Sequence, residues 1–266
     1  MLTKLLKYEI KTTSRMLLPI GGGVPVFNLL TGILTRLMGG GIESDALNWL
    51  YALVAFLAVL GIAVIIGACF FVNIQSFYKI LGDQGYTMFS LPVPAWQHIT
   101  AKLLCTMMWC VLCVPYLILC FGLMLMDFSW LSGFLMVSNT DPKLLLICVL
   151  LLLLALLGVA VMFLHAYLCC AIGAQFGQQR LLASIISYFV LGFVQEILFV
   201  ILVGFISFGS FQGSSWFLAP FFHLLVNDPI LASIIMLAAI NIFLVLIGTI
   251  FWAVTQWLIT RRLNLV

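Results

Sequence analysis

The feature that most constrains this chain is a series of six long apolar runs separated by short segments rich in charge, Pro or Gly. A hydrocarbon core of about 30 Å requires about 20 residues of helix, and each run is long enough to cross it. We therefore predict an all-α membrane protein, residues 1–266 forming a single transmembrane domain. The spans are expected near 17–37, 47–72, 99–126, 144–170, 181–206 and 231–258.

Composition identifies the solvent of these helices. The chain is 65% hydrophobic and only 7% charged, whereas soluble domains are about 45–50% apolar and about 25% charged. Such a chain cannot hide its apolar surface from water, so its first partner is a lipid bilayer. The net charge is only +3 and the Lys and Arg residues are scattered, which argues against a nucleic-acid partner.

The first 15 residues predict an amphipathic helix in the cytoplasmic interface. Leu2, Leu5, Leu6 and Ile10 fall near one helical face, and Lys4, Lys7 and Lys11 fall largely on another. A cleaved signal peptide is the competing interpretation, but no small-residue cleavage site follows a compact apolar core. In the first span, Pro19, the triplet 21–23 and Pro25 predict a helix that is kinked or partly unwound where protein or water satisfies the freed backbone groups.

The positions of the basic residues predict the orientation. With the N-terminus inside, two of the 11 Lys and Arg residues, Arg36 and Lys143, fall outside. The others fall inside: Lys4, Lys7, Lys11, Arg15, Lys79, Lys102, Arg180, Arg261 and Arg262. Basic residues concentrate on the cytoplasmic side of membrane proteins, so this sorting supports both the orientation and the count of six spans. Both termini are then cytoplasmic.

Motifs for chemistry on this chain are missing. No GxxxxGK[ST] is present, so we expect no ATP site here. His98, His165 and His223 fall in different parts of the predicted topology, so we expect no metal site, and His165 is expected to be a packed histidine. No HExxH or GxSxG occurs, and the Cys110–Cys113 CxxC stands alone in an apolar run. We predict no catalytic residue and no cofactor.

The inner segment 73–98 is the most informative part of the sequence. It contains FYKILGDQGYTMFSLPVPAWQH, in which apolar and aromatic residues surround the small polar turn 82–85. Pro92 and Pro94 then prevent a helix from continuing before the third span. A short helix, a turn and a second short element would form a firm protrusion able to bind a partner. The alternative is an ordinary solvated connection, although so many exposed aromatic rings would be unusual.

This segment resembles the cytoplasmic loop of bacterial permeases of the second ATP-binding-cassette exporter class (ABC-2), in which FYK, GD[EQ]GY and LPV recur in this order. The basic start, six spans and the RLNL ending at 262–265 are also similar. The resemblance implies a bacterial inner-membrane subunit, a partner ATPase dimer that binds ATP and Mg²⁺, and a second permease copy or paralogue. It implies that the coupling residues are Phe77, Tyr78, Gly82, Asp83, Gln84, Gly85 and Tyr86. Gln84 stands where Glu is more frequent, which leaves a carboxylate's role there open.

Three polar residues stand out within the predicted membrane. Gln195 and Glu196 on the fifth span and Asn241 on the sixth lie at similar depth if both helices start near the outer surface. We hypothesise that they line a translocation path or a subunit interface; a hydrogen-bonded clamp between these two helices is the equal alternative. The aromatic outer segment 208–230 is expected to re-enter the outer leaflet, covered by protein or an aqueous cavity.

The expected function is therefore the membrane-spanning subunit of an exporter for an amphiphilic substrate such as a peptide, a lipid-like molecule or a drug. Two other classes stay open. A scaffold or assembly subunit could use the same inner protrusion to bind any protein. A membrane-embedded enzyme is less favoured, because mid-span Glu196 has no obvious acid, base or metal partner in the sequence.

Overall fold

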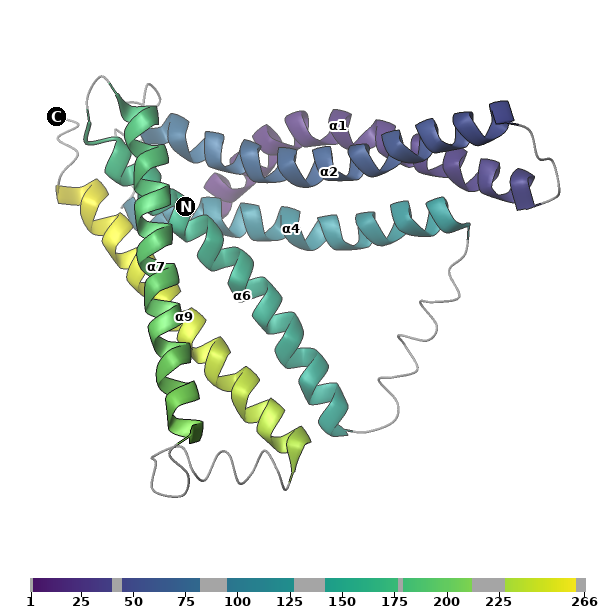
Figure 1. The fold of residues 1–266 in the computed structure, drawn as a ribbon. Helices are drawn as coiled ribbons and strands as arrows, with labels where there is room; N and C mark the ends of the chain where they lie inside the picture. The colour runs from purple at the N-terminus through teal and green to yellow at the C-terminus, as the bar shows by residue number, and fades with distance from the viewer. Residues whose placement is uncertain are drawn as a thin grey trace. The chain divides into compact units, whose positions relative to one another are not determined.

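The structure is a computed structural model that describes residues 2–39, 45–81, 95–126, 142–176, 179–211 and 228–261. These residues form long helices and no strand (Figure 1). The helices are α1 (Leu2–Gly39), α2 (Asp45–Leu81), α4 (Ala95–Leu125), α6 (Pro142–Gly173), α7 (Arg180–Phe211) and α9 (Pro229–Arg261). Each of these six is long and apolar enough to cross a membrane. Over the described residues, the predicted all-α class is confirmed, and so is the prediction of six helices able to span a membrane; the chain is a multi-pass membrane protein.

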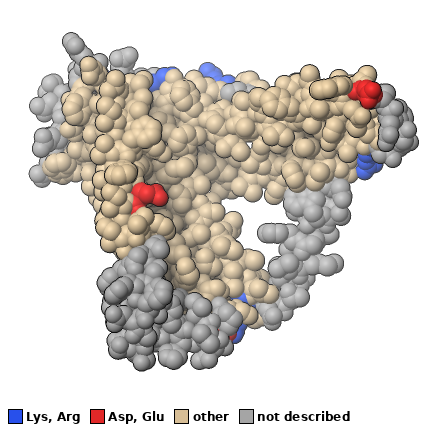
Figure 2. Space-filling model, in the orientation of Figure 1, with Lys and Arg blue, Asp and Glu red and all other residues tan. Residues whose placement is uncertain are grey.

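The surface of the helices is suited to lipid. Large apolar side chains such as Phe189 and Phe193 are 70% and 69% exposed, and many other exposed side chains on the same helices are also apolar. A soluble protein rarely exposes so large an apolar surface to water. Figure 2 shows that most of the described surface in view carries neither acidic nor basic groups. In a bilayer this surface needs no protein cover, because lipid tails are as apolar as the side chains.

The chain forms two compact units. The first unit comprises residues 1–79 and 91–135, and the second comprises residues 80–90 and 136–266. The first therefore contains α1, α4 and nearly all of α2, and the second contains α6, α7 and α9. The inner and outer segments for which a coupling protrusion and a re-entrant element were predicted lie outside the described residues over 82–94 and 212–227.

Helix α1 is continuous from Leu2 to Gly39, so the predicted interfacial start and the first span belong to one helix. Pro19 and Pro25 both lie inside it, and its ribbon is bowed in Figure 1 rather than unwound. Pro25 has no N–H, so the carbonyl oxygen of Gly21 loses its partner four residues on. The Tyr116 hydroxyl on α4 donates a hydrogen bond of 2.6 Å to this oxygen. A neighbouring helix thus supplies the missing donor, which explains how α1 tolerates the proline.

Helix α1 packs along α4 and contacts α2 in the first unit. Val24, Ile65 and Cys120, one from each helix, form a buried apolar cluster. Towards the C-terminal end of α1, a Cβ atom at Gly32 would overlap the carbonyl oxygen of Leu123. Only glycine permits this approach, since the clashing atom is backbone and cannot move aside.

In the second unit, α6 packs against both α9 and α7. The C-terminal half of α6 is its buried part, and His165 lies there, stacked between two aromatic rings. Its ring centroid is 4.9 Å from that of Tyr188 on α7 and 5.5 Å from that of Phe251 on α9. His165 is therefore a packed residue that joins all three helices, in agreement with the expectation from sequence.

Candidate functional site

A buried ion pair joins α1 to α4 in the first unit. The Lys102 ammonium donates a hydrogen bond of 2.9 Å to Glu9 Oε2, and the two side chains are only 5% and 11% exposed. Ser76 of α2 completes the group: its hydroxyl accepts a hydrogen bond from Lys102 and lies 3.4 Å from the same carboxylate oxygen. One acidic, one basic and one hydroxyl side chain, each from a different helix, therefore share one site.

A second layer of polar side chains extends this site along α2 and α4. The Thr106 hydroxyl lies 3.0 Å from Asn73 Oδ1 and 2.9 Å from the carbonyl oxygen of Lys102. Asn73 donates through Nδ2 to the Cys69 carbonyl at 2.7 Å. On the α1 side, the hydroxyl of Thr13 contacts the carbonyl oxygen of Glu9. One of these hydrogen bonds, between Thr106 and Asn73, joins α4 to α2 one turn away from Lys102.

Burial and charge together define what this cluster does. An isolated charge in an apolar interior costs several kcal/mol, whereas a pair with further hydrogen bonds offsets much of that cost. Glu9 and Lys102 carry opposite charges at contact distance, so the group is neutral as a whole. It can hold three helices in one register, and separating α1 from α4 would leave two uncompensated charges. The site is therefore a polar tie between helices; no reaction chemistry follows from it.

The tie lies close in sequence to both ends of residues 82–94, the part of the inner segment between α2 and α4. Ser76 precedes the end of α2 at Leu81 by about one and a half turns, and Lys102 follows the start of α4 at Ala95 by about two turns. Of the coupling residues predicted from sequence, Phe77 is buried and Tyr78 is half-buried. Gly82, Asp83, Gln84, Gly85 and Tyr86 lie outside the described residues. The tie therefore connects the C-terminal part of α2 with the N-terminal part of α4 and with α1.

The intramembrane polar residues predicted in the second unit are only partly brought together. Asn241 is buried and donates through Nδ2 to the carbonyl oxygens of Leu150 at 3.3 Å and Leu237 at 2.8 Å. It thus joins α9 to α6, whereas the clamp considered from sequence joined the fifth and sixth spans. Gln195 is half-buried and Glu196 is exposed on α7. Within the described ranges, no hydrogen bond or ion pair links either of them to Asn241.

Sequence reasoning missed the ion pair. Glu9 lies within the apolar face defined by Leu5, Leu6 and Ile10. A carboxylate on an apolar face requires a partner, so this position alone could have indicated a buried ion pair. Lys102 was counted only as an inner basic residue, although it lies inside a predicted span. The sequence does not say that the two meet, since they are 93 positions apart.

Comparison with known protein families, with curated proteins and with solved structures found no match for this chain.

Proposed function

We propose that this chain is the membrane-spanning subunit of an ATP-driven exporter of the ABC-2 type, and that its inner segment binds a separate ATPase. The observation that carries the proposal is the sequence of that segment, FYKILGDQGYTMFSLPV, placed between the second and third of six spans. ATP and Mg²⁺ would bind the ATPase dimer, because this chain has no phosphate-binding loop of its own.

The polar tie supports a mechanical role for the first unit. An ATPase that closes on ATP would move the segment 82–94, and the flanking helices α2 and α4 carry Ser76 and Lys102 close to its two ends. Because Lys102 also binds Glu9, α1 would move with them. In this proposal the first unit acts as one lever. The pathway for an amphiphilic substrate would open between this chain and a second copy or a paralogue.

The exposed face of α7 supports the presence of a second permease chain. Glu196 is exposed near the middle of a helix whose other exposed side chains are largely apolar. A carboxylate facing lipid at the bilayer centre costs about 2.5–3.5 kcal/mol even on insertion scales, so it needs protein or water beside it. A second chain covering α7, or a water-filled path along it, would provide that environment.

The test is a replacement of residues 82–86 by a Gly/Ser linker of equal length. We expect a Walker-motif ATPase to copurify with the parent chain and to be lost with the replaced chain. A linker of the same length at 212–216 in the outer segment is the matched control and should keep the ATPase. An intact complex after the inner replacement would refute the proposed contact. Copurification of other proteins without an ATPase would instead favour a scaffold.

A further inference from the structure

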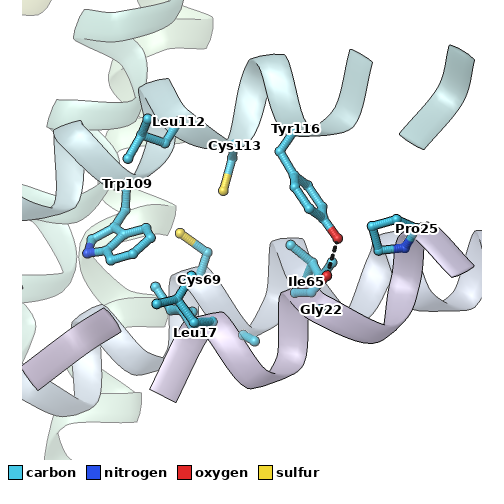
Figure 3. Close-up of a pocket in the computed structure, with 12 residues that line it drawn as sticks. Leu17, Gly22, Pro25, Ile65, Cys69, Trp109, Leu112, Cys113 and Tyr116 are labelled. Atoms are coloured by element: carbon cyan, nitrogen blue, oxygen red, sulfur yellow. Dashed lines mark hydrogen bonds between the residues drawn. The ribbon is translucent and has the colours of Figure 1, made fainter. Parts of the chain in front are cut away.

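A cavity of about 370 Å³ lies between the three helices of the first unit (Figure 3). Helix α1 lines it where prolines and glycines interrupt the usual bulky side chains, and α2 and α4 provide the other walls. The lining residues are Leu17, Leu18, Gly21, Gly22, Pro25, Ile65, Ala68, Cys69, Trp109, Leu112, Cys113 and Tyr116. Its volume falls in the lower part of the range for small-molecule sites, about 300–1,000 Å³.

The chemistry of the lining selects an apolar occupant. None of the described residues that line the cavity is charged. The Tyr116 hydroxyl, which points to α1 in Figure 3, is already bonded to the Gly21 carbonyl at 2.6 Å. Cys69 and Cys113 contribute thiols, which behave as small apolar groups in such surroundings. A charged or strongly polar group would lose its hydration here without gaining partners. A hydrocarbon chain makes no hydrogen bonds with water, so it can enter this cavity without that cost.

The cavity is open to the outside of the first unit. Among the lining residues, Leu18 is 66% and Leu112 is 50% exposed, and Gly22 is exposed as well. These residues belong to helices that are long and apolar enough to cross a membrane, so lipid tails would surround them in a bilayer. A lipid chain can therefore enter sideways, without passing through water.

Basic side chains continue the same face of α1 toward its N-terminus. Lys7, Lys11, Leu18, Gly22 and Pro25 follow one another at spacings of three, four or seven residues, which place them on one helical stripe. Both lysines are exposed. Lys11 lies about 16 Å below Gly22 along the helix, at 1.5 Å per residue. That separation suits a phosphate near the membrane surface and an acyl chain that extends into the core.

Arg15 adds a third exposed cation, one turn before Leu18. These three cations are free to bind an anion, because the acidic residue of the same helix segment already has another partner. Glu9 lies on the other side of α1 and is bound to Lys102 of α4. Within the described part of the chain, no ion pair involves Lys7, Lys11 or Arg15. These three cations, followed along α1 by an apolar cavity, are suited to a phospholipid: the cations can bind an anionic headgroup, and the cavity can hold its hydrocarbon tail.

We propose that the first unit binds an anionic phospholipid, with one acyl chain in the cavity and its phosphate against Lys7, Lys11 and Arg15. The proposal rests on the membrane location and on the first unit alone, so it holds or fails independently of the exporter function. The bound lipid would fill the space beside the proline-containing part of α1 and would stabilise the bow of that helix against α2 and α4.

Filling the cavity tests the position of the acyl chain. A Cβ atom at Gly22 or at Gly23 meets no atom within 4 Å, so a larger side chain starts in open space at either position, but only Gly22 lines the cavity. The full chain is titrated in detergent with phosphatidylglycerol brominated on its acyl chains, and quenching of tryptophan fluorescence is measured. The contribution of Trp109 is the difference between each protein and the same protein carrying Trp109→Phe. We expect Gly22→Leu to weaken this quenching at least tenfold and Gly23→Leu to leave it unchanged.

Removing the cations tests the position of the phosphate. Lys11→Gln and Arg15→Gln should each weaken binding of brominated phosphatidylglycerol about fivefold and leave brominated phosphatidylcholine unchanged. Lys79→Gln is the control, because Lys79 is exposed on α2 and lies outside the cavity lining. Inorganic phosphate should not displace the lipid at millimolar concentration; displacement would indicate an anion site without an acyl chain.

Two further outcomes would overturn the proposal. Equal quenching in the Gly22→Leu and Gly23→Leu proteins would show that the acyl chain lies elsewhere. A change from dimer to monomer in Gly22→Leu, with lipid quenching unaltered, would show that a second copy of the chain covers the cavity. Native mass spectrometry of the same samples reports both the retained lipid and the oligomeric state.

Discussion

Replacing Lys102 by methionine leaves the Glu9 carboxylate buried without its counter-charge, and we expect this to be among the most destabilising single changes in the first unit. The charged atoms are 2.9 Å apart. At an effective dielectric constant of about 20, their attraction is about 6 kcal/mol. Desolvation of both groups offsets part of this in the intact protein. Removal of one partner of a buried pair therefore costs about 3–5 kcal/mol.

The prediction is measured as a double-mutant cycle. Glu9→Gln, Lys102→Met and the double variant are unfolded by SDS in mixed micelles, with helix content followed by circular dichroism. The double variant leaves no buried charge, so its cost should be at least about 2 kcal/mol smaller than the sum of the single costs. Lys143→Gln is the control: it breaks an ion pair with Asp228 at 3.7 Å whose side chains are 55% and 46% exposed. Its cost should be at most about 1 kcal/mol.

Two results would refute this reasoning. Additive single costs within about 0.5 kcal/mol would show that Glu9 and Lys102 do not interact in the folded protein. A Lys102→Met cost no larger than that of Lys143→Gln would show that the pair is open to water, and then the cluster could not tie α1 to α4.

Three other changes probe the packing, each by the same unfolding assay. Tyr116→Phe should cost about 1–3 kcal/mol, because it leaves the Gly21 carbonyl unsatisfied. In a chain that also carries Pro25→Ala, the restored N–H of residue 25 should remove most of that cost. An equal cost of Tyr116→Phe with Pro25 and with Ala at position 25 contradicts this. Gly32→Ala should cost about 1–3 kcal/mol through overlap with α4, whereas Gly23→Ala, in open space, should stabilise by up to about 1 kcal/mol. Asn241→Leu should cost about 0.6 kcal/mol; an unchanged stability would show that its bond to α6 contributes nothing.

The helical class and the number of long helices were predictable from sequence, because the chain is suited to a lipid bilayer as its solvent. Six apolar runs in a chain with few charges permit only helices in a bilayer, because each helix satisfies its own backbone hydrogen bonds. The run predicted at 144–170, for example, lies within the longer helix α6, Pro142–Gly173. The prolines of α1 predicted backbone groups that protein or water would satisfy, and for Pro25 the Tyr116 hydroxyl does so at the Gly21 carbonyl; the sequence did not identify Tyr116.

The contacts between helices were not predictable, because lipid-facing and helix-facing residues have the same composition. On α9 the apolar residues surround the helix, so no face of it identifies α6 as the neighbour. The depth argument that paired Asn241 with Glu196 was therefore insufficient, since equal depth does not bring two helices together. Glu9 differs, because its charge on an apolar face is a local signal, although the identity of Lys102 as partner requires the fold.

The central claim is that the inner segment contacts an ATPase, and site-specific photo-crosslinking tests it most directly. A photoreactive amino acid is placed at Asp83 in the full chain in its native membrane, and the matched position is Trp216 in the outer segment. The account predicts a crosslinked Walker-motif ATPase from position 83 and none from position 216. Labelling of position 83 by a membrane-impermeant reagent added outside, or no ATPase in the crosslinked product, would contradict it.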